Sequence, residues 1–221
     1  MDAGKKYSLV LGSQSPRRKE LLGWLKVPFE IICSDADESS EELDPRIMVE
    51  DVCERKAKAV FEICSKKPGF GETYFPLIVT ADTTVCYEKK IYNKPTDIND
   101  ARRMLLELAG KDHKVLTGVA IYAIDPVTKQ RRERVFSCQT LVRFDHITQD
   151  ILENYLASGE SLDKAGAYGI QGQTLTFISH LEGSYSNVVG FPLSHFIDEL
   201  REFLGHANDE RGDWRKLFHH G

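Results

Sequence analysis

The chain has 221 residues, of which 41% are hydrophobic and 29% charged, enough for the core of one globular domain or of two lobes around a cleft. A net charge of −5 and a pI near 5.8 argue against a general nucleic-acid-binding protein, because such proteins are normally basic. No apolar run approaches the ~18 residues of a membrane span and the N-terminus lacks a signal-peptide pattern, so we expect no membrane partner. The five cysteines form no Cys-x-x-Cys pair, so we expect reduced thiols in a cytoplasmic protein that binds no zinc.

The predicted elements alternate between strands and helices, which is typical of an α/β fold with a mixed central sheet and flanking helices. In chain order, strands are expected at residues 7–11, 29–33, 77–87, just after 88–90, 115–124, 135–144 and 175–181. Helices are expected from Pro16 through Leu25, Pro45 to about Cys64, Asp97 to Gly110, Thr148 to Ala157, and from Pro192 onward. We expect one domain over residues 1–205, followed by a loosely held polar tail at 206–221.

The segment from Ser13 to Arg18 is the strongest candidate for a ligand site. Ser15 and Pro16 suit the N-cap and the first position of a helix. Arg17 and Arg18 then place positive charge at the positive end of the helix dipole, where it is unfavourable unless an anion is nearby. Free backbone N–H groups, two guanidinium groups and two hydroxyls favour a phosphate site, with a solvated basic turn as the alternative.

Two charged residues interrupt apolar patterns. Lys56 lies in the middle of the apolar stripe of the helix that starts at Pro45, so it either extends to solvent or meets a buried anion. Asp82 interrupts an apolar strand, where a lone buried carboxylate is costly. It either caps a bulge, or it binds a metal or polarises a water molecule.

Other candidates are weaker. Lys94 is held extended by the following proline and could reach a phosphate, although a solvated loop lysine fits as well. Glu38 lies in the acidic loop 34–44; acidic runs are usually solvated, but a carboxylate beside a phosphate site commonly holds magnesium. In the segment 163–172, glycines let a ligand approach and Gln171 can pair with a base edge, with a bare surface turn as the alternative. His113 is expected to pack or pair structurally.

Taken together, these segments resemble the Maf family of nucleoside triphosphate pyrophosphatases, from residue 9 to about residue 200. The motifs that carry the resemblance are Ser13–Arg18, Lys56-Ala57, Ala81-Asp82-Thr83, Lys94-Pro95-Thr96-Asp97, Thr117-Gly118-Val119, the block 158–172, Gly183-Ser184-Tyr185 and Asn187-Val188-Val189-Gly190. Several motifs in the right order are much more specific than any single one. Thr80 stands where the family usually has a glycine, and the loop 66–76 is longer than usual.

The resemblance implies hydrolysis of a nucleoside triphosphate to the monophosphate and pyrophosphate, with Mg²⁺, Mn²⁺ or Co²⁺ as a divalent cofactor. It implies a fold similar to that of inosine triphosphate pyrophosphatase, with two lobes around a nucleotide-binding cleft, and often a homodimer. The implied catalytic residues are Asp82, Lys56, Lys94 and Glu38, of which Asp82 and Glu38 would also bind the metal. The residues implied in substrate binding are Ser13, Arg17, Arg18, Thr83 and Gln171.

The segment 163–172 is similar to that of the subgroup acting on dTTP and UTP, so we expect these substrates or modified pyrimidine triphosphates. One alternative is a nucleotide-binding regulator of cell division with little catalysis; the presence of Asp82, Glu38 and both lysines argues against it. Another is a purine-directed pyrophosphatase, which the Tyr168–Gln171 run does not favour.

Overall fold

The computed structural model describes residues 6–219. Its strands are β1 (Tyr7–Leu11), β2 (Phe29–Ile31), β3 (Phe75–Tyr87), β4 (Lys90–Tyr92), β5 (Asp112–Ile124), β6 (Arg131–Phe144) and β7 (Ile178–Glu182). Its α-helices are α1 (Pro16–Gly23), α2 (Pro45–Ser65), α3 (Ile98–Leu108), α4 (Gln149–Ala157), α5 (Tyr185–Val189) and α6 (Leu193–Phe203). Three 3₁₀ turns are η1 (Ala165–Ala167), η2 (Gly172–Thr176) and η3 (Asp213–Leu217).

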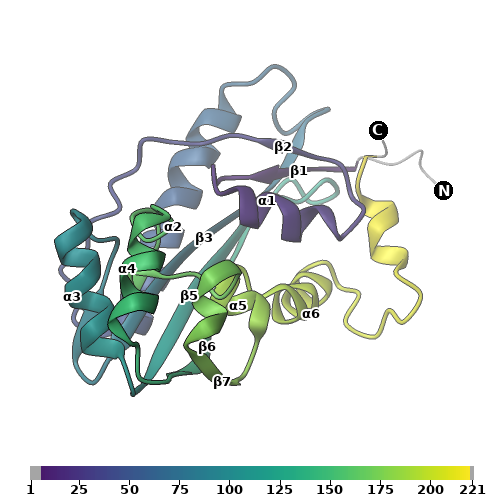
Figure 1. The fold of residues 1–221 in the computed structure, drawn as a ribbon. Coiled ribbons are helices and arrows are strands. Elements are labelled where there is room, and N and C mark those ends of the chain that lie inside the picture. The colour runs from purple at the N-terminus through teal and green to yellow at the C-terminus, as the bar shows by residue number, and fades with distance from the viewer. Residues whose placement is uncertain (1–5, 220–221) are drawn as a thin grey trace.

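Within these residues the strands form one seven-stranded sheet in the order β2-β1-β3-β5-β6-β7, with β4 paired to β3 outside this path. β1 runs parallel to β2 and β3, whereas the other pairs are antiparallel. Helices flank this sheet (Figure 1). The predicted α/β class and mixed sheet are confirmed.

Side chains alternate between the two faces of the sheet, as the twofold period of a strand requires. On β3, Leu77 and Val79 belong to the main core, which also contains Leu22 of α1 and Phe196 of α6. Ile78 lies on the other face, in a second cluster beneath α2. Continued along β3, this alternation directs residue 82 toward α2 and residue 83 toward the opposite face.

Side-chain caps fix the starts of α1, α2 and α3. The Ser15 hydroxyl accepts from the Arg18 N–H (3.4 Å), and the Asp44 carboxylate accepts from two N–H groups at the start of α2. Thr148 precedes α4 as expected but makes no side-chain capping bond to the helix backbone. These caps place the first turns of α1 and α2 as the sequence indicates.

Some boundaries differ from the prediction. α1 ends at Gly23, so Trp24, expected on its buried stripe, is 57% exposed. Residues 172–176 form η2, so β7 begins only at Ile178. The short helix α5 was not predicted, because five residues are too few to show a helical period.

The expectation of a loosely held tail is wrong for the part of it that the structure describes. Trp214 and Phe218 are buried, and Phe218 bridges to Tyr7 of β1 with ring centroids 5.9 Å apart. Arg215 donates from Nε to the Leu25 carbonyl (2.8 Å). Two large aromatic side chains bury enough apolar surface to hold a polar segment on the domain. The last two residues of the expected tail lie outside the described part.

No helix within residues 6–219 is long and apolar enough to cross a lipid bilayer. All five cysteines lie in the described part, and none forms a disulfide.

Candidate active site

A cleft of about 910 Å³ lies beside the loop that follows β1. Its lining includes residues 12–18, parts of α2 and β3, and parts of the segments 160–172 and 188–190. All nine residues predicted for the site line this cleft: Ser13, Arg17, Arg18, Glu38, Lys56, Asp82, Thr83, Lys94 and Gln171. The structure therefore brings together side chains that span most of the sequence, while their individual roles stay predictions.

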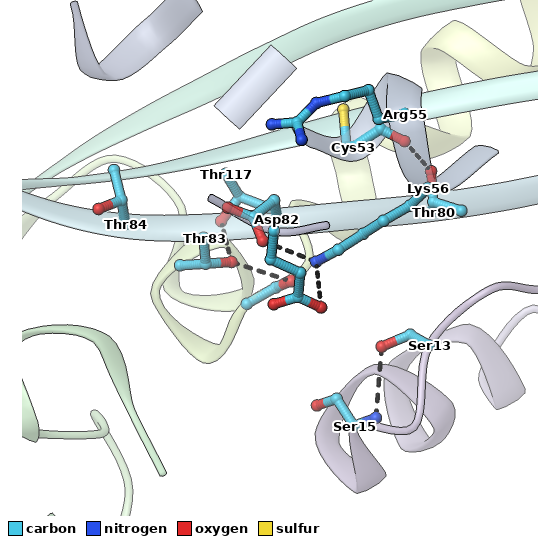
Figure 2. A network of polar contacts seen from close by, with 12 residues as sticks. Ser13, Ser15, Cys53, Arg55, Lys56, Thr80, Asp82, Thr83, Thr84 and Thr117 are labelled. Carbon is cyan, nitrogen blue, oxygen red and sulfur yellow. Dashed lines mark hydrogen bonds and ion pairs between the residues drawn. The ribbon is translucent and has the colours of Figure 1, made fainter. Parts of the chain in front are cut away.

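The centre of the site is an ion-pair cluster around Lys56. Its Nζ lies 2.8 Å from Asp82 Oδ1 and 3.0 Å from Glu38 Oε1. Figure 2 shows Lys56 reaching from α2 to Asp82 on β3. Lys56 is therefore the lysine that meets an anion, not one that extends to solvent. The β3–β5 register is unbroken at Asp82, so this carboxylate does not cap a bulge.

The lysine also sets the charge state of Glu38. Burial alone would raise the pKa of this carboxyl group, but the hydrogen bond and charge of Lys56, aided by the charges of Lys94 and Arg18, hold the pKa below its ordinary value. Glu38 thus stays ionised at neutral pH, which suits a group facing cations.

Two close contacts fix α2 against the sheet. Thr80 is fully buried and donates from Oγ1 to the Cys53 carbonyl (2.6 Å), so the residue that replaces the usual family glycine ties α2 to β3. Gly118 of β5 pairs with Asp82, and a Cβ added there would lie 2.3 Å from the Val49 carbonyl oxygen of α2. The helix carrying Lys56 therefore rests directly on the strand opposite Asp82.

On the other face of β3, Arg18 holds Thr83. The guanidinium donates to Thr83 Oγ1 (3.0 Å), to the Gly190 carbonyl (2.8 Å) and to Ser13 Oγ (3.3 Å). Burial lowers the pKa of Arg18, and the charges of Asp82 and Glu38 oppose that effect. Since three of its donors are used by the protein, Arg18 is not a residue of a solvated basic turn.

Three other predicted site residues make fewer contacts with the rest of the protein. Arg17 makes one long ion pair with Asp163 (3.6 Å) across the cleft. The side chains of Lys94 and Gln171 are exposed and make no hydrogen bond or ion pair within residues 6–219. These three side chains are the ones most available to a ligand.

Sequence reasoning missed the supports behind these residues. Thr117 lies 2.9 Å from Thr83, hydroxyl to hydroxyl, and donates to the Asn187 carbonyl (3.1 Å). Gly190 adopts φ 116° where its carbonyl receives Arg18. A positive φ signals glycine at a turn, but no sequence pattern indicates which side chain will reach that carbonyl.

The donor set fits a cation that arrives with its substrate. No group of three or more His, Cys, Asp or Glu side chains in the described chain could hold a metal by itself. Asp82 and Glu38, however, place two carboxylates in the cleft around one amine. Mg²⁺ is commonly held by one or two carboxylates together with substrate phosphates, so these residues suit that mode of binding.

Comparison with known proteins gives a consistent picture. The family model for Maf-like proteins matches residues 8–203. Curated relatives named dTTP/UTP pyrophosphatase, from Bacillus cereus strains AH187 and AH820 and from Bacillus anthracis, are each 41% identical over 196 residues. The alignments cover 88% of this chain and 95% of each relative. The chain that builds this cleft therefore belongs to the Maf family.

Proposed function

We propose that this protein is a nucleoside triphosphate pyrophosphatase that hydrolyses dTTP and UTP to the monophosphate and pyrophosphate, clearing these or modified pyrimidine triphosphates from the nucleotide pool. The observation that carries the proposal is the contact of Lys56 with both Asp82 and Glu38 inside a cleft lined by the arginine-rich start of α1. The names of the curated relatives support the same substrates.

The cationic side chains supply the charge complement of a triphosphate. Arg17 and Lys94 line the cleft and are the most accessible, while the first N–H groups of α1 add a positive helix end. Arg18 contributes mainly by holding Ser13 and Thr83 in place. Such fixed donors stabilise the charge that develops on the phosphoryl oxygens in the transition state.

Asp82 is placed to act as the base. Oδ1 receives Lys56, and no hydrogen bond within residues 6–219 engages Oδ2. Oδ2 accepts a proton from a water molecule as the water oxygen bonds to the α-phosphorus in line with the leaving group. The bond from that phosphorus to the oxygen shared with the β-phosphorus breaks, and pyrophosphate leaves with the electron pair.

We propose Asp82 and Glu38 as the protein ligands of a divalent cation. Such an ion would neutralise phosphate charge and would lower the pKa of a bound water molecule. Lys56 would then orient the two carboxylates that it contacts.

We also propose a cytoplasmic protein, supported by five unpaired cysteines, and a homodimer, which sedimentation or light scattering of the purified chain tests directly.

The experiment is pyrophosphate release from dTTP, UTP, CTP, ATP and GTP with Mg²⁺, Mn²⁺ or Co²⁺, for the wild type and for Asp82→Asn. We expect selective turnover of dTTP and UTP, reduced by about 10²-fold or more in Asp82→Asn without loss of folding. Gln171→Ala should retain hydrolysis but relax the preference among bases.

Near-normal turnover by Asp82→Asn would refute the role of Asp82. Tight nucleotide binding without turnover by the wild type would indicate a regulator, and turnover confined to purines would refute the assigned base preference.

A further inference from the structure

A buried histidine that the proposed chemistry does not use lies behind the cleft. His113, near the start of β5, is only 1% exposed. Its Nε2 is 2.7 Å from the hydroxyl oxygen of Tyr168, and Phe144 packs against both rings at 4.6 and 4.7 Å between centroids. Burial lowers the pKa of His113 to about 4, so the pair is uncharged at neutral pH. The expected structural partner of His113 is therefore Tyr168, which itself lines the cleft.

Tyr168 belongs to a segment whose backbone is costly to hold. Residues 165–172 form no strand, and Gly166, Ala167 and Gly172 all have positive φ. For a residue with a side chain, such as Ala167 at φ 63°, this conformation costs roughly 1 kcal/mol. Contacts to the rest of the fold must offset that cost.

The contacts that offset this cost join the segment to the core of the domain. Tyr155 donates its hydroxyl to the Ala167 carbonyl (3.1 Å), and the Gly166 N–H donates to the Asn93 carbonyl (3.2 Å). The Tyr168 ring occupies the aromatic pocket with His113. This ring is the large aromatic side chain by which the segment enters the core.

The position of Gln171 depends on this attachment together with two further anchors, the buried side chain of Ile170 and the hydroxyl of Thr174, which donates to the Gln171 carbonyl (3.3 Å). Gln171 follows Tyr168 by three residues, lines the same cleft and is exposed, with no hydrogen bond from its side chain to residues 6–219. A carboxamide selects between bases only when its distance and direction to the base edge are fixed. One that is free to move can turn and offer its donor or its acceptor to either uracil or cytosine.

We propose that His113, through its hydrogen bond to Tyr168, is a positioning residue for base selection: it fixes the segment 165–172 so that Gln171 favours the imide edge of uracil and thymine over the edge of cytosine. This inference rests on the proposed function. It assigns a role in specificity to a side chain that lies outside the cleft and touches no substrate.

The test compares kcat and KM for UTP and CTP in the wild type and in three variants. Tyr168→Phe removes only the hydroxyl, and His113→Phe replaces the imidazole by an apolar and somewhat larger ring. The double variant removes both partners, which avoids leaving one buried polar group unpaired if a single variant folds poorly. Tyr122→Phe is the matched control, because it deletes another tyrosine hydroxyl bond on β5, to Glu54 (2.8 Å), remote from this segment.

We expect Tyr168→Phe and the double variant to lower the UTP-to-CTP ratio of kcat/KM at least threefold, mainly through a higher KM for UTP, as the loss of about one hydrogen bond predicts. Tyr122→Phe should keep the ratio. An unchanged ratio in folded, active Tyr168→Phe and double variants would overturn the inference while leaving the proposed function intact. Absence of turnover by the wild type on every nucleotide would refute the proposed function itself, and this inference with it.

Discussion

The substitution Gly118→Ala tests whether the approach of α2 to the sheet sets the geometry of the ion-pair cluster of Lys56 with Asp82 and Glu38. An added Cβ would lie 2.3 Å from the carbonyl oxygen and 2.5 Å from the carbonyl carbon of Val49. These are backbone atoms, so no rotamer change relieves the clash. The carbonyl oxygen must move by about 1 Å to reach an ordinary contact of 3.4 Å. We expect the free energy of unfolding to fall by ~1–3 kcal/mol, the usual cost of overpacking.

The same displacement of α2 should also change the Lys56–Asp82 contact and lower the turnover rate. Lys56 lies two helical turns after Val49 on the same face of α2, and its Nζ is 2.8 Å from Asp82, the residue paired with Gly118. A displacement of about 1 Å at reacting groups can cost ~10²-fold in rate, so we expect a loss of turnover larger than the loss of stability accounts for.

Urea unfolding followed by tryptophan fluorescence and pyrophosphate release measured well below the unfolding midpoint separate these two effects. Gly23→Ala at the end of α1 is the control, because an added Cβ there meets no atom within 4 Å. This control should be neutral or more stable by up to ~1 kcal/mol. If Gly118→Ala matches Gly23→Ala in both stability and turnover, the reasoning is refuted.

Two further substitutions test the ionisation of Glu38 and of His113. Lys56→Met removes the hydrogen bond and charge that lower the Glu38 pKa against the effect of burial. The acid limb of the pH–rate profile should therefore move to higher pH while turnover falls, and an unmoved limb would contradict this. For His113, the folded state keeps the pKa at about 4, below its ordinary 6.5, so the unfolded state binds more protons between these values and wild-type stability should fall as pH drops from 6.5 to 4. That gap corresponds to up to ~3 kcal/mol, and His113→Phe should lose much less stability over this range in pH-dependent urea unfolding.

Local chemistry allowed the site to be predicted in outline. The Ser15 cap, the interruption of an apolar helix stripe by Lys56 and the interruption of an apolar strand by Asp82 are signals within a few residues of sequence. Each breaks or completes a local rule, so each could be read without knowing the fold. The resemblance to the Maf family then implied that these residues lie together in one cleft.

The contacts that hold those residues could not be predicted in the same way. Arg18 and Thr83 are 65 positions apart, and the partner of His113 is 55 positions away in a glycine-rich segment. Phe218 is buried against Tyr7 of β1, which lies more than two hundred residues earlier. Such pairs depend on strand order and register, which a single sequence does not specify.

The alternation of side chains on β3 has a functional consequence. Consecutive residues of a strand face opposite sides, so Asp82 meets Lys56 of α2 while Thr83 meets Arg18 of α1. The carboxylate proposed as the base and the hydroxyl proposed to select the substrate are thus adjacent in sequence but hydrogen-bonded to different side chains. If the proposed roles hold, we expect changes on the Arg18 side to affect nucleotide choice mainly through Thr83, although the charge of Arg18 also acts on Asp82 and Glu38. In the proposed function, one strand would thus present a hydrolytic group on one face and a recognition group on the other.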